Sequence, residues 1–187
     1  MVKTNRTPLL EVNNLSVSFR MYDEGLSQRD LKVISDLSIT LYPGEVLAVA
    51  GSSGSGKSLL AHSILGLMPK NATVTGSMKF EGQELTADLQ RKLRGREMAL
   101  IPQSITYLDP LMKVGQQVRG DKKDSVSVDR QRNVFRRLGL DESVEQMYPF
   151  QLSGGMARRV LFSTAAISDA KLIIADEPTP GMHLAQA

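Results

Sequence analysis

Eight consecutive residues, 51–58, have the types and spacing of a loop that binds phosphate groups. They read Gly-Ser-Ser-Gly-Ser-Gly-Lys-Ser, so every fixed position of the pattern G-x-x-x-x-G-K-[ST] is present. Glycines let the backbone wrap closely around a polyphosphate, and its amide N–H groups then point at the oxygens from the start of a helix. The predicted phosphate-binding residues are Gly51, Ser52, Ser53, Gly54, Ser55, Gly56, Lys57 and Ser58.

Two side chains of this loop could act directly on a nucleoside triphosphate. Lys57 would place a positive charge at the β- and γ-phosphates, and Ser58 would offer its hydroxyl to Mg²⁺. A flexible Gly/Ser-rich loop is the alternative interpretation. The flanks favour the phosphate site, because an apolar run precedes the loop and a helix-like run follows it.

An acidic pair, Asp176 and Glu177, follows a short apolar run at residues 172–175. Such a run is typical of a buried parallel strand, and strand C-terminal ends lie at the edge of the sheet that carries phosphate loops. We expect Asp176 to hold Mg²⁺, directly or through water, and Glu177 to orient or deprotonate the attacking water. A solvated strand end is the alternative. The pattern predicts instead that Lys57 and Asp176 converge on one metal-bound nucleotide.

A second anion site is predicted at Ser153, Gly154 and Gly155, which precede a helix expected over about residues 157–167. Ser153 would lie near the N-cap, and the two glycines would leave backbone N–H groups bare. Ser-Gly-Gly alone also fits an ordinary capped turn. Its occurrence together with the other motifs favours the anion site.

Hydrophobic patterning predicts an α/β fold. Alternating apolar residues indicate antiparallel strands at 10–19 and 33–41, joined by a polar loop at 20–30. The nearly continuously apolar run 45–50 predicts a strand buried on both faces that delivers the phosphate loop. A helix is expected from 57 to about 67, with His62 in a packing or surface role.

The rest of the chain continues this alternation of strands and helices. Strands are predicted at 73–80 and 98–101, the second ending at Pro102, with a helix at 86–93 between them. Apolar residues then become sparse, which indicates a subdomain boundary. A further helix is expected at 129–138, ended by Gly139; its arginines suit a solvated face better than anionic lipid.

Composition excludes several classes of protein. The chain has 187 residues, 41% of them hydrophobic and 23% charged, as in ordinary globular proteins, and its net charge is only +3. That charge is far from the basic patches of a dedicated nucleic-acid binder. Cysteine is absent, so disulfides and thiolate metal sites are excluded. Without a leader-like or bilayer-length apolar run, we expect a soluble, cytosolic chain.

Taken in chain order, residues 51–58, Gln103, residues 152–156 and residues 172–177 resemble the motifs of the ATP-binding cassette ATPases, and the resemblance covers the chain from about residue 9 to its last residue. The resemblance implies a P-loop NTPase (RecA-like) core with an N-terminal antiparallel β-subdomain and an inserted helical subdomain. The core and β-subdomain would cover about 1–103 and 161–187, and the helical subdomain about 104–160. ATP and Mg²⁺ are the implied cofactors.

The same resemblance implies further site residues. Phe19 would stack on adenine, with Tyr22 as the second candidate, and Gln103 would touch Mg²⁺ and the lytic water. Ser153, Gly154 and Gly155 would form the signature that closes over ATP held by the phosphate loop of a partner subunit. The working unit would therefore be a head-to-tail dimer of identical or related subunits with two nucleotides at its interface.

A narrower resemblance is to the ATPase subunits of oligopeptide, dipeptide and nickel importers. It rests on the stretches 108–117, 148–151 and 153–156, the last with Met after the signature glycines. It implies ATP hydrolysis that energises import of peptides or nickel, and two permease subunits gripped near residues 103–117. An extracytoplasmic binding protein would act indirectly, nucleic acid would not be a partner, and the subunit would sit on the inner face of the membrane.

Three departures from the family pattern stand out. Residues 180–183 read Pro-Gly-Met-His, so His183 stands where a carboxylate normally helps couple the two sites. Arg158 occupies a position where Gln is common. The chain also ends at Ala187, before the strand that normally precedes the switch histidine, so we expect a C-terminally truncated cassette. Two alternatives to an ATP-hydrolysing importer subunit stay open. One is a truncated cassette that binds ATP without turnover, and the other is a soluble cassette protein acting on DNA or ribosomes.

Overall fold

The computed structural model describes residues 6–22, 28–120 and 122–178. The chain folds as two compact units, residues 1–94 and 95–187. The division predicted from the sequence, with a helical subdomain at about 104–160, remains a prediction.

The first unit is built on an antiparallel sheet. Its strands are β1 (Leu10–Tyr22), β2 (Gln28–Leu41), β3 (Ala72–Phe80) and β4 (Gln83–Glu84), in the order β2-β1-β3-β4. The antiparallel pairing predicted for the N-terminal segment is confirmed. Both long strands extend into the predicted loop, because their backbones continue to pair as far as Tyr22 with Gln28, and Arg20 forms an ion pair with Asp30 at 3.7 Å.

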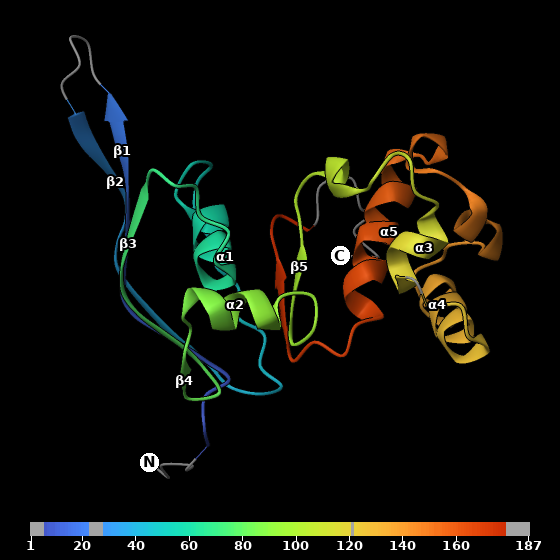
Figure 1. Ribbon diagram of the computed structural model, residues 1–187, viewed down its shortest axis with the longest axis horizontal. Coiled ribbons are helices and arrows are strands. Elements are labelled where there is room, and N and C mark those ends of the chain that lie inside the picture. The colour runs from blue at the N-terminus through green and yellow to red at the C-terminus, as the bar shows by residue number, and fades with distance from the viewer. Residues whose placement is uncertain (1–5, 23–27, 121, 179–187) are drawn as a thin grey trace. The chain divides into compact units, whose positions relative to one another are not determined.

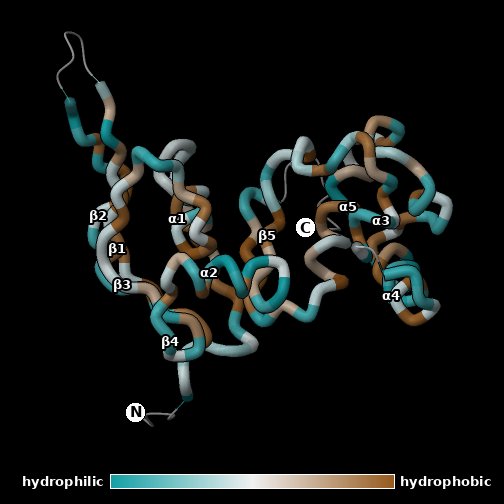
Figure 2. The backbone as a smooth tube through the Cα atoms, viewed as in Figure 1, coloured by the Kyte–Doolittle hydropathy of each residue, from teal (hydrophilic) through white to brown (hydrophobic). Residues whose placement is uncertain are grey.

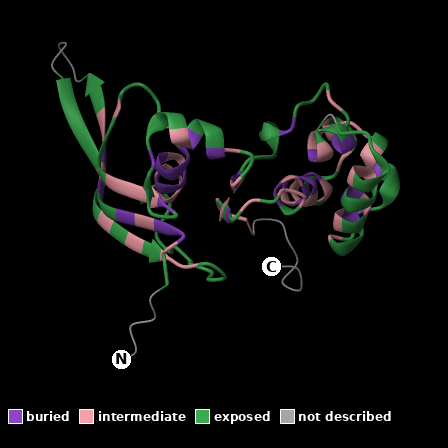
Figure 3. Cartoon of the chain, turned by 60° about the horizontal axis from the view of Figure 1, so that its bottom comes forward, coloured by how far each residue is buried: buried purple, intermediate pink, exposed green. Residues whose placement is uncertain are grey.

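One face of this sheet forms part of the core. Val12, Leu15 and Val17 of β1 lie on the covered face, where none of the three is exposed to solvent, and the register shift between Val12 and Leu15 accounts for their spacing of three residues. Figure 2 shows the change of hydropathy along the strand. Helices α1 (Lys57–Leu65) and α2 (Ala87–Leu93) lie beside the sheet (Figure 1). Buried residues occur both in the sheet and in the helix next to it (Figure 3).

The ends of the two helices follow from local chemistry. Helix α1 stops at Gly66, which has a φ of 65°, so it is shorter by two residues than the predicted 57–67. The side-chain amide of the buried Gln90 on α2 donates to the carbonyls of Ser63 and Ile64 at 2.9 and 3.0 Å. Thr86 caps the start of α2 by accepting from the N–H of Leu89 at 3.3 Å.

The predicted strand at residues 45–50 is wrong for this structure. The segment has no assigned strand, and Val46 is 98% exposed. An apolar run becomes a strand only where a neighbouring strand supplies hydrogen bonds and covers its side chains. Among the described residues of the first unit, the sheet has the order β2-β1-β3-β4 and does not include this segment. Hydrophobic content alone therefore gave the wrong local structure.

The second unit contains a parallel pair of strands, β5 (Met98–Ile101) and β6 (Leu172–Ala175), with the bounds that the sequence predicts. Their register runs from Met98 opposite Leu172 to Ile101 opposite Ala175. Helix α5 (Gly154–Ala166) packs on this pair, its Ala165 in a buried cluster with Ala99 and Ile101. The helix starts three residues before the predicted 157 because Ser153 caps it.

The helical part of this unit has a core of its own. It consists of α3 (Val114–Arg119), α4 (Ser125–Arg137) and the 3₁₀ turns η1 (Ile105–Tyr107), η2 (Glu142–Gln146) and η3 (Pro149–Gln151), packed against α5. Their shared buried cluster comprises Leu108, Val114, Val118, Phe135, Leu140, Val144, Ala157, Val160 and Leu161. Helix α4 begins at the Asp124 cap, earlier than predicted, and Gly139 follows it with a φ of 65°, as expected.

The arginines of α4 are largely engaged in ion pairs within the unit. Arg130 contacts Asp169 at 2.5 Å, Arg132 contacts Glu145 at 3.2 Å and Arg136 contacts Glu142 at 3.4 Å.

His62 is half-buried on α1. Within the described part of the chain, no helix is both long enough and apolar enough to cross a bilayer.

Candidate functional site

The phosphate loop, residues 51–58, lies in the first unit and leads directly into α1. Gly56 is the N-cap of α1 and, having no side chain, makes no capping hydrogen bond. The N–H groups of a helix's first turn have no partner within the helix, so a helix start without a side-chain cap favours an anion there. Residues 51–55 are exposed, which leaves this start open to a ligand.

Two positions of the loop require glycine. Gly54 and Gly56 have φ angles of 78° and 93°, in the left-handed region that other residues rarely adopt. A Cβ on Gly56 would also lie 3.0 Å from a side-chain carbon of Ile34 on β2. The loop is therefore held in a conformation that fits glycine and is braced against the sheet.

The side chain of Lys57 folds back over the start of the phosphate loop. Its ammonium group donates to the carbonyl oxygens of Gly51 at 2.9 Å and Ser52 at 2.8 Å. These contacts place a positive charge next to the turn of the loop, where a phosphate oxygen could replace a carbonyl as the acceptor. The position of Lys57 fits the role that its place in the motif predicts.

The candidate adenine-stacking residues lie on β1. Phe19 is half-buried and pairs with Leu31 of β2 and Ala72 of β3. Tyr22, 70% exposed, accepts a hydrogen bond from the Gln28 side chain at 3.5 Å. Adenine stacking by either ring remains a prediction.

The second unit brings two of the predicted catalytic residues together. The side-chain amide of Gln103, which follows β5, donates to the carboxylate of Glu177, which follows β6. Because β5 and β6 are parallel neighbours, their C-terminal ends meet at one edge and carry these side chains with them. The carboxylate that could accept a proton from water thus has a polar amide directly beside it.

A residue that the sequence did not single out as functional completes this cluster. Arg158 of α5 donates from one guanidinium nitrogen to the backbone carbonyl of Glu177 at 3.2 Å and from the other to that of Gln103 at 3.0 Å. Glu177 has a φ of 44°, a left-handed conformation for a residue with a Cβ. The only sequence signal was that Arg158 departs from the usual Gln.

The candidate Mg²⁺ ligands all supply oxygen, as this hard cation prefers. Asp176 sits at the end of β6, its N–H bonded to the carbonyl of Ile101 at 2.9 Å, with a half-buried side chain. Ser58 is in the first turn of α1. Mg²⁺ in nucleotide sites is commonly held by few protein groups together with phosphate oxygens, which matches Ser58, Gln103 and Asp176 in type. Convergence of Lys57 and Asp176 on one nucleotide involves both units and stays a prediction.

The predicted signature forms an exposed start to α5. The hydroxyl of Ser153 caps the helix by accepting from the N–H of Met156 at 3.3 Å. Gly154 and Gly155 are exposed, and a Cβ on either would meet nothing within 4 Å. The turn is therefore open on its outer side. The departure at Pro180 to His183 lies outside the described residues.

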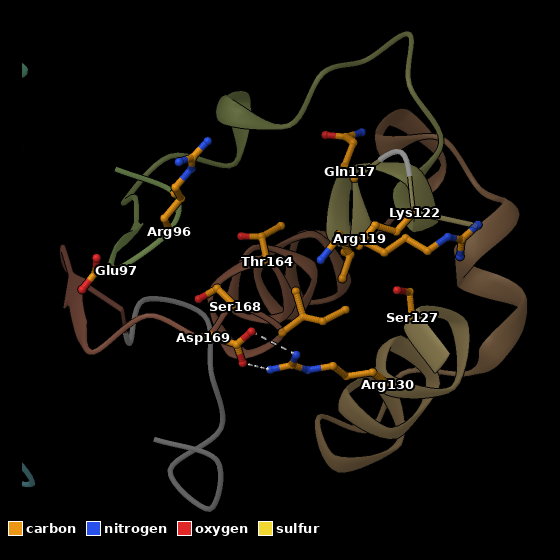
Figure 4. Close-up of a pocket in the computed structure, with 14 residues that line it drawn as sticks. Arg96, Glu97, Gln117, Arg119, Lys122, Ser127, Arg130, Thr164, Ser168 and Asp169 are labelled. Atoms are coloured by element: carbon orange, nitrogen blue, oxygen red, sulfur yellow. Dashed lines mark hydrogen bonds and ion pairs between the residues drawn. The ribbon is translucent and has the colours of Figure 1, made fainter. Parts of the chain in front are cut away.

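A pocket of about 650 Å³ opens elsewhere in the second unit, among α3, α4, the end of α5 and the start of β5 (Figure 4). None of the predicted site residues lines it. On one side Arg130 donates to Asp169, and this hydrogen bond, together with the positive charge of Arg130, lowers the pKa of Asp169. The pocket is thus separate from the cluster around Glu177.

Comparison with protein families gives one match that covers most of the chain. Residues 34–180 match the model of the family described as "ABC transporter". The oligopeptide transport ATP-binding protein OppD of Lactococcus lactis subsp. cremoris is 37% identical over 94% of this chain and 54% of its own length. OppD of Salmonella typhimurium is 36% identical over 94% and 55%. A putative peptide import ATP-binding protein of Brucella abortus is 35% identical over 98% and 58%. The chain thus spans about half the length of these curated relatives.

Solved structures share the fold. A dimeric, post-hydrolysis structure of the ATP-binding cassette MJ0796 bound to ADP and Pi has a TM-score of 0.80 over 95% of this chain and 77% of that one, with 23% identity. A bacterial Atm1-family ABC exporter with ATP bound has a TM-score of 0.69 over 99% of this chain and 32% of that one, with 21% identity. The predicted fold class, a P-loop NTPase cassette, is confirmed.

Proposed function

Since this chain belongs to the ABC transporter family of ATP-binding cassettes, we propose that it binds and hydrolyses MgATP as the energising subunit of a peptide importer. The contact between the Gln103 amide and the Glu177 carboxylate is the observation on which hydrolysis rests. A phosphate loop alone supports nucleotide binding. An amide-paired carboxylate at the end of the neighbouring strands adds a group that can handle the attacking water.

The candidate site residues have distinct parts in the proposed reaction. The backbone N–H groups of residues 51–58 and the ammonium of Lys57 bind the β- and γ-phosphates and offset their charge. Ser58 and Asp176 would hold Mg²⁺, which would neutralise charge developing on the phosphates. The Glu177 carboxylate accepts a hydrogen bond from water and orients it toward the γ-phosphate, and Gln103 fixes the position of that carboxylate.

The exposed signature turn supports a dimer as the working unit. Ser153, Gly154 and Gly155 present an uncovered helix start that can contact phosphate bound to a second cassette. In a head-to-tail pair, each nucleotide would bind between the phosphate loop of one subunit and the signature of the other. ATP then favours association, because it binds the paired state more tightly than the separate subunits.

Peptide import is favoured over nickel import by the names of the curated relatives, which are oligopeptide, dipeptide and peptide ATP-binding proteins. The proposed partners are a second ATP-binding subunit and two permease subunits, with a substrate-binding protein acting indirectly. The chain would act at the inner face of the membrane. Purification of the full-length protein with its partners tests this: integral membrane proteins should co-purify, whereas nucleic acid or ribosomes would support the soluble alternative.

Nucleotide binding is tested by titration of MgATP into the wild-type chain and Lys57→Ala. The variant lacks the charge beside the loop, so its affinity should fall by at least tenfold. Lys70→Ala, at an exposed lysine of the same unit, is the matched control and should bind like the wild type. Equal affinity in all three proteins would contradict the proposed site.

A further inference from the structure

Arg158 links the signature helix to both catalytic segments. It lies on α5, five residues after the Ser153 cap, and its two terminal nitrogens reach the backbones of Glu177 and Gln103 at 3.2 and 3.0 Å. These acceptors belong to segments 74 residues apart in the sequence, which the parallel strands bring together. One side chain therefore bridges the turns after both strands.

The backbone at Glu177 needs such support. A φ of 44° brings a side chain close to its own backbone, so this conformation is less favourable than an ordinary one. Such conformations persist only where the surroundings hold them. At Glu177 the surroundings hold both ends of the residue: Arg158 bonds its carbonyl and Gln103 bonds its carboxylate.

The adjacent arginine shows that this arrangement is specific to position 158. Arg159 donates to Gly155 at 3.2 Å and Gly139 at 2.9 Å, so it stabilises the helical part of the unit and reaches neither catalytic segment. A guanidinium has donors fixed in a planar fork and can serve two separated carbonyls at once. A Gln side chain is shorter and carries both of its N–H groups on one nitrogen, so it is poorly suited to bridge two separated carbonyls as the two guanidinium nitrogens do.

We infer that Arg158 is a positioning residue for hydrolysis, which fixes the Gln103–Glu177 pair and ties it to the signature turn at the start of α5. This inference rests on the proposed ATPase function. Its consequence is mechanical: a displacement of the α5 start is transmitted through Arg158 to the carboxylate that handles water. Binding of nucleotide to the phosphate loop does not use this residue.

The test compares Arg158→Ala, Arg158→Lys and Arg158→Gln with the wild type in MgATP affinity and in single-turnover hydrolysis of bound ATP. Affinity should stay within about threefold. The hydrolysis rate should fall about 10- to 100-fold in Arg158→Ala, because small displacements of a reacting group cost that much. Arg158→Lys and Arg158→Gln should fall between, because each has one donor nitrogen in place of the two that Arg158 uses. Arg137→Ala, at an exposed arginine of α4, is the control and should hydrolyse ATP normally.

A second measurement does not depend on turnover. Hydrogen exchange at the amide of Asp176, which bonds to the carbonyl of Ile101 at 2.9 Å, should accelerate in Arg158→Ala and remain unchanged in Arg137→Ala. Unchanged exchange together with an unchanged hydrolysis rate would overturn the inference. A loss of ATP affinity and melting temperature in step with hydrolysis would also overturn it, since that indicates a merely structural role.

The outcomes separate this inference from the proposed function. If wild-type protein binds ATP but never hydrolyses it, the ATPase proposal fails, and the exchange experiment alone decides whether Arg158 positions Glu177. If the wild type hydrolyses ATP, the double variant Arg158→Ala with Glu177→Gln should be no slower than Glu177→Gln alone, because Arg158 acts through that carboxylate. Additive losses would contradict the link.

Discussion

Replacing Gly54 by alanine tests whether the backbone of the phosphate loop itself determines nucleotide affinity. Gly54 has a φ of 78°, and a Cβ there would meet nothing within 4 Å, so the substitution adds no clash within the chain. The whole penalty is conformational, about 1 to 2 kcal/mol for a left-handed alanine. The free loop can relax to a different conformation, but a bound phosphate would require it to return. MgATP affinity should therefore fall about 5- to 30-fold, since about 1.4 kcal/mol is tenfold.

The chain offers a closely matched control. Gly82, between β3 and β4, has the same φ of 78° and equally open surroundings. Gly82→Ala should lower the free energy of unfolding by a similar amount, measured by urea denaturation, yet leave the calorimetric titration with MgATP unchanged. Gly56→Ala extends the series: its Cβ would lie 3.0 Å from Ile34, so its affinity should be lower still.

Two results would show that this reasoning is mistaken. One is a Gly54→Ala variant that binds MgATP as tightly as the wild type, which would mean that the left-handed conformation is unnecessary in the bound loop. The other is an equal loss of affinity in Gly82→Ala, which would mean that affinity follows overall stability. Either result would show that the left-handed conformation of the loop does not determine the affinity for MgATP.

Three further predictions concern stability. Gln90→Leu leaves the carbonyls of Ser63 and Ile64 without their side-chain donor, so the free energy of unfolding by urea should fall by about 1 to 3 kcal/mol; no change would show that water replaces the amide. Phe135→Ala empties a side-chain site that is 0% exposed and should cost about 3 to 5 kcal/mol in the same assay, so a loss below 1 kcal/mol would contradict the packing described for α4. Burial raises the pKa of Glu145, but hydrogen bonding and charge from Arg132, with the charge of Arg119, outweigh burial and lower it from 4.5. The unfolded chain then binds the proton more readily, so the stability from Glu145 is present above about pH 4.5 and is lost as the pH falls through the lower folded pKa. Urea denaturation between pH 3 and 6 should show this loss in the wild type and less of it in Glu145→Gln.

Short motifs and periodicity predicted those strands and helices whose bounds are marked by residues within or next to the element itself. The bounds of β5 and β6 followed from compact apolar runs ended by Pro102 and by Asp176. Helix ends were predicted to within a few residues where a cap or glycine marks them, as at Gly139. Glu177 was predicted from the strand end and Gln103 from the resemblance alone; their direct contact was not predicted, and it arises because β5 and β6 are parallel neighbours whose C-terminal ends lie at one edge.

The remaining features depend on partners that lie far away in the sequence. The apolar run 45–50 looks like a buried strand, but a strand exists only where another strand pairs with it. Helix α3 was not predicted, because its six residues contain two glutamines and a glycine and gain stability from packing of Val114 and Val118. The bridge made by Arg158 could not be predicted, because its acceptors are backbone carbonyls, which every residue possesses.

The most direct test of this account is a single experiment on the wild-type chain and Glu177→Gln. Both proteins are loaded with γ-labelled MgATP, and bound nucleotide and released phosphate are measured in the same samples. The variant keeps the phosphate loop but loses the carboxylate that handles water, so both should bind ATP and only the wild type should release phosphate. Phosphate release at equal rates from both proteins, or no binding of MgATP by the wild type, would contradict the account.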